Sequence, residues 1–468
     1  DNMIPQIIDN QFYFADGQIK DEDYEYGSFV QSKMFHNGVR CSSCHNPHSG
    51  KLLAVDNQLC MNCHDPKYNS KQHHFHVVNT ESSKCINCHM QQRTYMGNDH
   101  RRDHSFRVPR PDQSIVYNTP NTCTSCHKQK NAKWAADAII KWYGPKRSYH
   151  FSDDLLPGSL LNDKSEKHLV KLLGDTLQPE IVRATAVFYL SSLHTTVSVK
   201  LLMEMLNDNQ AMVRYHALRG LANFSPQLWQ QVAYTKLSDP VRAVRIAAAD
   251  LYHQIPEQSI PGSYKMAFQQ ADEENRKYLN YQTDFAAGNV MLADYQLQGG
   301  EHVRAVENYI RGLSKDSLMN YARFNLSSAY NMLGKNNEAL QVLKDVAAID
   351  PGNERVYYKL GLLYFEMGNV DAAIASFQQG VERKAANVSL YYNYGLVLQQ
   401  EGKLIDAEKI LKKGYAIDPL ATNINYALAY FYFKQGRRND AIVHAMVLHQ
   451  RDPRNPDYQS LFRALGIL

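Results

Sequence analysis

Four copies of the unit C-x-x-C-H constrain this chain more than any other feature. They occupy residues 41–45, 60–64, 85–89 and 123–127. Two thiols three positions apart can form thioether bonds along one edge of a porphyrin, and the histidine that follows can then face the iron as an axial ligand. The spacing therefore predicts four covalently attached c-type haems. The predicted thioether positions are Cys41, Cys44, Cys60, Cys63, Cys85, Cys88, Cys123 and Cys126, and the predicted proximal ligands are His45, His64, His89 and His127.

Zinc binding and disulfide formation are the alternatives for these cysteines. The first two units also fit zinc-ribbon spacing, and paired thiols in an exported chain can be disulfides. However, histidine makes up only 19 of 468 residues, so its presence after all four pairs by chance has a probability on the order of one in a few hundred thousand. A structural zinc site does not need that histidine. Haem attachment is therefore the preferred interpretation.

The remaining histidines are candidates for the opposite, distal side of each iron. Twelve of the 19 histidines lie in the first 150 residues, and eight of these are outside the motifs. Four irons need four distal ligands, so coordination by two histidines at every iron is possible. His48 is too near His45 to reach the opposite face of its own iron and suits a neighbouring haem. The preferred candidates are His48, His73, His76 and His104, and the weaker ones are His36, His74, His100 and His150.

Length, charge and hydropathy limit the remaining possibilities. A chain of 468 residues should divide into about three domains. A net charge of +4 gives no reason to expect nucleic acid as a partner. No apolar run approaches the roughly 18–20 residues of a membrane-spanning helix. The chain begins at Asp1, so we expect a signal peptide to have been removed. Because haem is attached to such motifs outside the cytoplasm, the predicted location is periplasmic or extracellular.

The N-terminal 150 residues are expected to form a loop-rich haem domain. Residues 1–35 show little periodicity and are predicted to be an extended arm over this domain. Pro109, Pro111 and Pro120 predict an extended connection between the third and fourth motifs. The first long amphipathic segment is 131–143. Residues 151–164 are predicted to be a linker, because Pro157 and Gly158 interrupt any period.

Two internal repeats follow. Val-Arg recurs at 182, 213 and 244, each time before an alanine-rich amphipathic stretch, which predicts three HEAT-like helical hairpins over 165–256. Residues 264–285 are predicted to be a bridging helix. Small residues then recur every 34 positions, which is the period of the tetratricopeptide repeat (TPR). Five TPR units are expected over 286–455, with a capping helix at 456–468. The predicted fold is mainly α, a multihaem cytochrome c domain followed by an α-solenoid.

This combination resembles the bacterial multihaem c-type cytochromes that carry HEAT-like and tetratricopeptide repeats after their haem domain. The resemblance rests on residues 26–34, 41–50, 85–90, 95–96, 101–107 and 119–123. It implies an exported electron-transfer protein.

Three functions are therefore open. The preferred hypothesis is a tetrahaem electron carrier without catalytic residues, whose repeats bind other redox proteins or copies of the chain in a homo-oligomer or filament. A multihaem reductase or dehydrogenase of a small nitrogen or sulfur oxyanion is the alternative, and it would require one open iron. The third hypothesis is an assembly scaffold that carries haems along a polymer.

Overall fold

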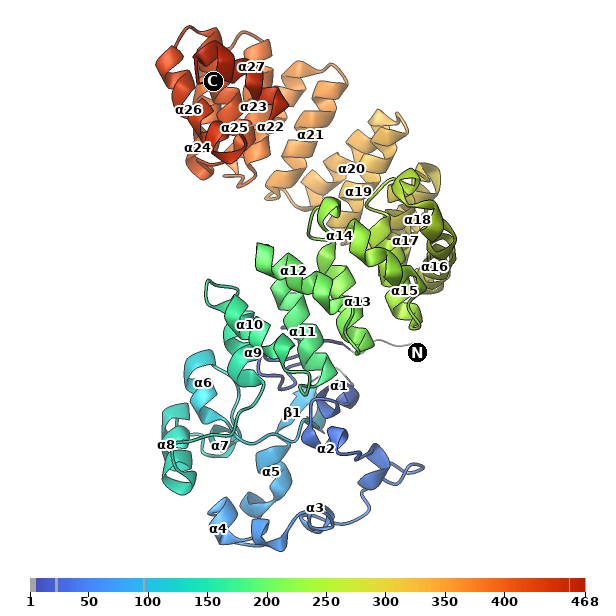
Figure 1. The fold of residues 1–468 in the computed structure, drawn as a ribbon, viewed down its shortest axis with the longest axis vertical. Coiled ribbons are helices and arrows are strands. Elements are labelled where there is room, and N and C mark those ends of the chain that lie inside the picture. Colours follow the sequence, from blue (N-terminus) through green and yellow to red (C-terminus); the bar gives the residue numbers. More distant parts are fainter. Residues whose placement is uncertain (1–5, 22–23, 96, 454, 468) are drawn as a thin grey trace. The chain divides into compact units, whose positions relative to one another are not determined.

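The computed structural model describes residues 6–21, 24–95, 97–453 and 455–467 (Figure 1). Met96, one of the residues that carry the resemblance, lies outside these ranges. The chain forms two compact units, residues 1–275 and 276–468, called here the first and second units. Both consist mostly of helices, which confirms the predicted mainly-α fold class. None of the helices in the described ranges combines the length and hydropathy needed to cross a bilayer.

The segment with the four motifs is built from short helices and loops, with one antiparallel pair of strands. In β1 and β2, Gln92 pairs with Arg102 and Tyr95 with Asp99. The elements are α1 (Glu25–Phe29), α2 (Lys33–His36), η1 (Cys41–Ser43), α3 (Gln58–Met61), η2 (Pro66–Tyr68), α4 (Lys71–His74), η3 (Glu81–Ser83), α5 (Cys85–His89), β1 (Gln92–Tyr95), β2 (Asp99–Arg102), α6 (Pro111–Tyr117), α7 (Thr122–Cys126) and α8 (Ala132–Tyr143).

The proline-based prediction for the stretch before the fourth motif is wrong in part. Pro111 is the first residue of α6, where a missing N–H costs nothing because the first helical donors have no partner within the helix. The helix predicted over 131–143 is confirmed as α8. Its N-cap is Asn131, whose side chain accepts a hydrogen bond from the amide of Trp134.

The predicted linker at 151–164 is also wrong. Residues Ser152–Ser159 form helix α9, in spite of Pro157. Leu155 and Leu156 are fully buried in this helix, and the lack of a side chain at Gly158 lets Leu169 of α10 approach closely. The apolar residues therefore decided the conformation, because their burial outweighs the one hydrogen bond that proline removes.

The rest of the first unit is a series of helices linked by ion pairs. Arg183 binds Asp208, Arg214 binds Asp239 at 2.8 Å, and Arg245 binds Glu274 at 2.6 Å. Each recurring arginine therefore ties its helix to an acidic residue 25 to 29 positions later in the chain. These helices are α9 (Ser152–Ser159), α10 (Ser165–Gly174), α11 (Glu180–Ser191), α12 (Thr196–Met205), α13 (Ala211–Leu221), α14 (Pro226–Ala233), η4 (Tyr234–Ser238), α15 (Arg242–Tyr252), η5 (Glu257–Ser259) and α16 (Gly262–Tyr281).

The N-terminal arm joins the motif segment to these helices. Ile8 and Tyr13 are fully buried in the core of the first unit, and the amide of Ile8 donates to Thr185 Oγ1 of α11 at 2.9 Å. Further along, the amide of Ile19 donates to Asp103 next to β2, at 3.1 Å. The arm is thus more than a cover for the motif segment, because its apolar side chains complete the helical core.

The second unit consists of antiparallel helix pairs followed by a last helix (Figure 1). Small residues let the paired helices approach: a Cβ on Gly361 would meet the ring of Phe377, and one on Gly395 would meet Leu411, both at 2.5 Å. The elements are η6 (Gln282–Asp284), α17 (Ala286–Gln298), α18 (His302–Lys315), α19 (Asn320–Met332), α20 (Asn336–Ile349), α21 (Glu354–Glu366), α22 (Val370–Glu382), α23 (Val388–Gln400), α24 (Leu404–Ile417), α25 (Thr422–Lys434), α26 (Arg438–Arg451) and α27 (Pro456–Leu465).

Candidate haem-binding site

Each C-x-x-C-H unit lies on or beside a short helix or helical turn. The first motif contains η1, and the second overlaps the end of α3. The third motif coincides with α5, and α7 ends within the fourth. All eight cysteines are free thiols. In the described ranges, no three His, Cys, Asp or Glu side chains converge on a metal-ion site.

Three of the four motif histidines each face a histidine from elsewhere in the chain. His45 lies opposite His104, with ring centres 6.4 Å apart and planes at 38°. His89 lies opposite His73 at 6.2 Å and 11°. His127 lies opposite His76 at 6.2 Å and 31°. His73, His76 and His104 belong to the preferred distal candidates, and the structure brings each of them to a different motif.

The separation of these rings fits an iron between them. A metal-bound imidazole nitrogen lies about 2.0 Å from the metal and about 1.1 Å from its own ring centre, so rings on opposite sides of one iron have centres about 6.2 Å apart. The observed separations are 6.2–6.4 Å. His74 and His76 are also 6.4 Å apart, but they are two positions apart in the chain and cannot hold opposite faces of a porphyrin. The three long-range pairs therefore have the donor chemistry and spacing that a haem requires.

Backbone carbonyls orient four of the six paired rings. The Nδ1–H of His45 donates to the carbonyl of Gly50 at 2.8 Å, and that of His89 donates to the carbonyl of Arg107 at 2.7 Å. His104 donates to Arg102 at 2.8 Å, and His76 to His74 at 2.5 Å. A bond at Nδ1 fixes the tautomer and leaves the lone pair of Nε2 free for a metal.

Burial favours the neutral form of one of these pairs. It lowers the pKa of His89 and also that of His73. An iron ligand must be a neutral imidazole with a free lone pair. The environment of this pair therefore disfavours the protonated state that would compete with metal binding.

Helix α8 holds the short segment that carries two of the distal candidates. Residues 71–76, called here the ligand run, include both His73 and His76. Phe75 adopts a left-handed conformation with φ of 58° at the end of α4, and its ring stacks on Trp142 at 4.4 Å and 3°. Tyr143 Oη donates to the carbonyl of His73. Contacts at His73 and Phe75 therefore hold the ligand run against α8.

The sequence did not predict the aromatic residues that support the paired histidines. Besides Phe75 and Trp142, they include Trp134, whose ring centre lies 4.8 Å from that of His127. One signal was present in the sequence: two of the three tryptophans follow the fourth motif within one amphipathic helix. The carbonyl partners left no signal, because every residue type carries one.

The other candidate histidines are placed elsewhere. His48 and His36 are exposed. His100 lies in β2, where its Nδ1 bonds Thr94 Oγ1 at 2.9 Å. His150 Nδ1 bonds Ser152 Oγ at 2.7 Å, and burial lowers its pKa to about 3. None of these four rings faces a motif histidine in the part of the chain that the structure describes.

His64 of the second motif also differs from the other motif histidines. Its ring is exposed, and Tyr68 meets it edge-on at 6.5 Å and 82°. The described ranges include every histidine of the chain, and none lies opposite His64 at the separation found in the three pairs.

The four motifs are neighbours in space. The thiol of Cys60 in the second motif is hydrogen-bonded to that of Cys85 in the third, and this contact together with burial raises the pKa of Cys60. Burial, with a smaller effect of the nearby thiol of Cys123, raises the pKa of Cys88 to about 11. Groups held by consecutive motifs would therefore lie close together.

The segment around the motifs lacks an apolar core of its own. Between residues 30 and 134, only Tyr95 and Pro111 are buried apolar side chains among the described residues. Val55 and Val77 are 78% and 68% exposed. A segment of this length normally buries aliphatic side chains to offset its loss of conformational entropy. The apolar faces of macrocycles would supply that missing surface.

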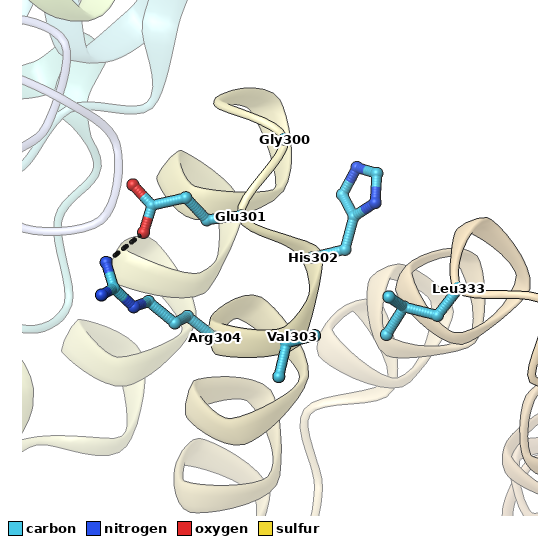
Figure 2. A pocket seen from close by; sticks show the side chains of 6 residues that line it. All are labelled: Gly300, Glu301, His302, Val303, Arg304 and Leu333. Carbon is cyan, nitrogen blue, oxygen red and sulfur yellow. Dashed lines mark hydrogen bonds and ion pairs between the residues drawn. The ribbon is translucent and has the colours of Figure 1, made fainter.

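A surface hollow lies in the second unit, whereas all four motifs lie in the first. It has a volume of about 330 Å³ and is lined by Gly300, Glu301, His302, Val303, Arg304 and Leu333. Figure 2 shows the ion pair of Arg304 with Glu301 on one side of it, with an N–O distance of 2.7 Å. His302 is the one imidazole among these lining residues, and the carboxylate of Glu301 is paired with arginines.

Comparisons with known families match both parts of the chain. A family model described as a doubled CXXCH motif matches residues 33–69. Models of the tetratricopeptide repeat match residues 290–354, 331–393 and 398–465. The chain therefore combines a paired CXXCH motif, as in multihaem c-type cytochromes, with TPR units in its C-terminal region. The paired motif points to covalently bound c-type haem, and the TPR units indicate protein–protein interaction.

Individual relatives match the repeat region. "TPR repeat-containing protein MJ1428" of Methanocaldococcus jannaschii is 27% identical over 148 residues, which cover 32% of this chain and 24% of that protein. The chain thus spans about a quarter of the length of this curated relative. Among solved structures, that of MamA protein is 22% identical and covers 37% of this chain and 95% of its own, with a TM-score of 0.32. TTC0263, a thermophilic TPR protein of Thermus thermophilus, is 21% identical and covers 39% and 100%, with a TM-score of 0.32.

Proposed function

We propose that this chain is an extracytoplasmic tetrahaem c-type cytochrome that relays single electrons between redox partners. In this proposal the first 150 residues carry the haems, residues 165–256 form HEAT-like hairpins, and the TPR units bind other redox proteins or further copies of the chain in an oligomer or filament.

The observation that carries the proposal is the set of three histidine pairs. Each pair joins a motif histidine to one that is distant in sequence, at 6.2–6.4 Å between ring centres. Coordination by two imidazoles saturates an iron and leaves no position for substrate. Such centres suit electron transfer better than catalysis.

The roles of the residues follow from their contacts. A bound haem supplies an iron that accepts and releases one electron. Each cysteine pair would hold one edge of a haem, and the motif histidine would be a ligand of its iron. Carbonyls such as those of Gly50 and Arg107 hold the imidazoles so that ligand geometry changes little between oxidation states. The hydrogen bonds of these rings therefore lower the reorganisation that accompanies each transfer.

The ligand run supports close packing of two haems. His73 faces the third motif and His76 faces the fourth, although only three positions separate these two histidines in the sequence. One short segment would thus supply a ligand to each of two haems and limit how far apart they can lie. Proximity of this kind favours electron hopping from one centre to the next.

The experiment that tests the function uses the full chain, produced with export and haem attachment. A pyridine haemochrome assay is expected to give four haems per chain, and stepwise reduction is expected to take up four electrons. Electrons should then pass reversibly to a second c-type cytochrome in stopped-flow mixing. Fewer than four haems, or reduced centres that fail to return their electrons to any acceptor, would count against the proposal.

A further inference from the structure

The four motif histidines divide into three that face another imidazole and one that does not. His45, His89 and His127 each have an opposing ring at 6.2–6.4 Å. His64 has no such ring in the described part of the chain, which contains all 19 histidines. The aromatic ring beside it is that of Tyr68, which is nearly perpendicular at 82°.

Tyr68 does not take the place of the missing imidazole. It follows His64 by four positions, a distance too short for its side chain to reach the opposite face of the same porphyrin. Its ring instead contacts His73 of the third-motif pair, at 5.1 Å and 76°. Tyr68 therefore lies between the second motif and its neighbour.

None of the histidine rings outside the pairs lies opposite His64 at the separation found in the three pairs, in the part of the chain that the structure describes. His100 and His150 bond nearby hydroxyls through Nδ1. His74 Nδ1 accepts a hydrogen bond from the backbone of His76 at 3.2 Å. His48 lies in a turn where Asn46 Oδ1 accepts from its amide at 3.0 Å. These contacts hold the rings of His74, His100 and His150 in their local surroundings, and His64 alone among the motif histidines has no imidazole opposite it in the described structure.

The second motif is also accessible from solvent. Cys63, His64 and the three residues that follow are all exposed, and Tyr68 is 41% exposed. By contrast, the ring of His89 is mostly buried and carries a lowered pKa for that reason. A small molecule could therefore reach the position opposite His64 without displacing a packed side chain.

We propose that the iron at the second motif is the exchangeable centre of this chain, which binds a small donor with a free lone pair, such as an imidazole or cyanide, opposite His64. The other three irons are closed by their histidine pairs. The inference rests on the proposed function for the presence of four haems, but the haem count and the ligand count are separate measurements.

The test is a titration of the oxidised holoprotein with imidazole and, separately, with cyanide. Binding is followed by the optical spectrum and by electron paramagnetic resonance, with haem content fixed beforehand by the haemochrome assay. We expect one equivalent per chain, so that a quarter of the haem changes its spectrum. No binding, or binding at two or more haems, would overturn the inference while leaving a count of four haems intact.

Variants locate the binding haem. The double substitution Cys60→Ala/Cys63→Ala removes the second haem and is expected to abolish binding. The matched control Cys123→Ala/Cys126→Ala also removes one haem but should keep one binding site. His104→Ala removes an opposing imidazole, so it should raise the count to two equivalents. If the cysteine variants fail to fold, the wild-type count and that of His104→Ala still decide, because equal counts in these two proteins contradict the assignment.

Discussion

The ligand run gives the most informative substitution, because three histidines within four positions are expected to behave differently. His73 faces His89, and His76 faces His127, at 6.2 Å in both cases. His74 faces no motif histidine. Removal of either paired ring should therefore open one haem of four, so that a quarter of the haem loses its second histidine. His73→Ala/His76→Ala should open half of the haem, and His74→Ala should open none.

Magnetic circular dichroism and electron paramagnetic resonance of the oxidised proteins measure these fractions. The low-spin signal from two axial histidines should be lost from a quarter of the haem in His73→Ala and in His76→Ala, from half in the double variant, and from none in His74→Ala. The opened centre should also rise in reduction potential, because a weaker donor replaces an imidazole. A loss of low-spin haem in His74→Ala equal to that in His76→Ala would refute the ligand assignment, as would unchanged spectra in all three variants.

Three further predictions concern stability, which urea unfolding followed by circular dichroism can measure. Asp239→Ala removes the carboxylate that pairs with the nearly buried guanidinium of Arg214; the side chains of Asp239 and Arg214 are 3% and 10% exposed. This substitution should lower the free energy of unfolding by about 3–5 kcal/mol. Asp250→Ala breaks an exposed pair and should lower it by less than about 1 kcal/mol. Gly395→Ala places a Cβ 2.5 Å from a leucine of the paired helix and should cost about 1–3 kcal/mol; a neutral result would contradict the close approach. Burial lowers the pKa of His216 to about 4, so between about pH 6.5 and pH 4 this histidine is protonated in the unfolded chain and neutral in the folded one. The free energy of unfolding should therefore fall by up to about 3 kcal/mol as the pH drops through this range. This decrease should be smaller in His216→Leu.

Much of the fold could be predicted because its signals are periodic. The Val-Arg recurrence reappears as arginines that bind acidic residues further along the chain, such as Arg214 with Asp239. The small residues of the 34-residue repeat reappear where paired helices touch, as at Gly395. Helix α9 was not predicted, because Pro157 outweighed the two leucines before it in a purely local interpretation. Burial against α10 and α11, which no local rule contains, reversed that balance.

For the candidate site, the chemistry could be predicted but the pairing of the ligands could not. The motif spacing names the cysteines and proximal histidines without any structure. Which of eight further histidines approaches which motif depends on long-range contacts, such as the stacking of Phe75 on Trp142. The structure places His73, His76 and His104 opposite motif histidines, and their role as iron ligands stays a prediction. His48, the fourth preferred candidate, lies in an exposed turn away from such a position.

Covalent attachment of four haems is the claim on which the electron-transfer account depends, and intact-protein mass spectrometry with metal analysis tests it directly. The exported chain should have the mass of its 53.5 kDa polypeptide plus four haems, with four iron atoms. A mass equal to that of the polypeptide alone, or zinc in place of iron, would contradict it.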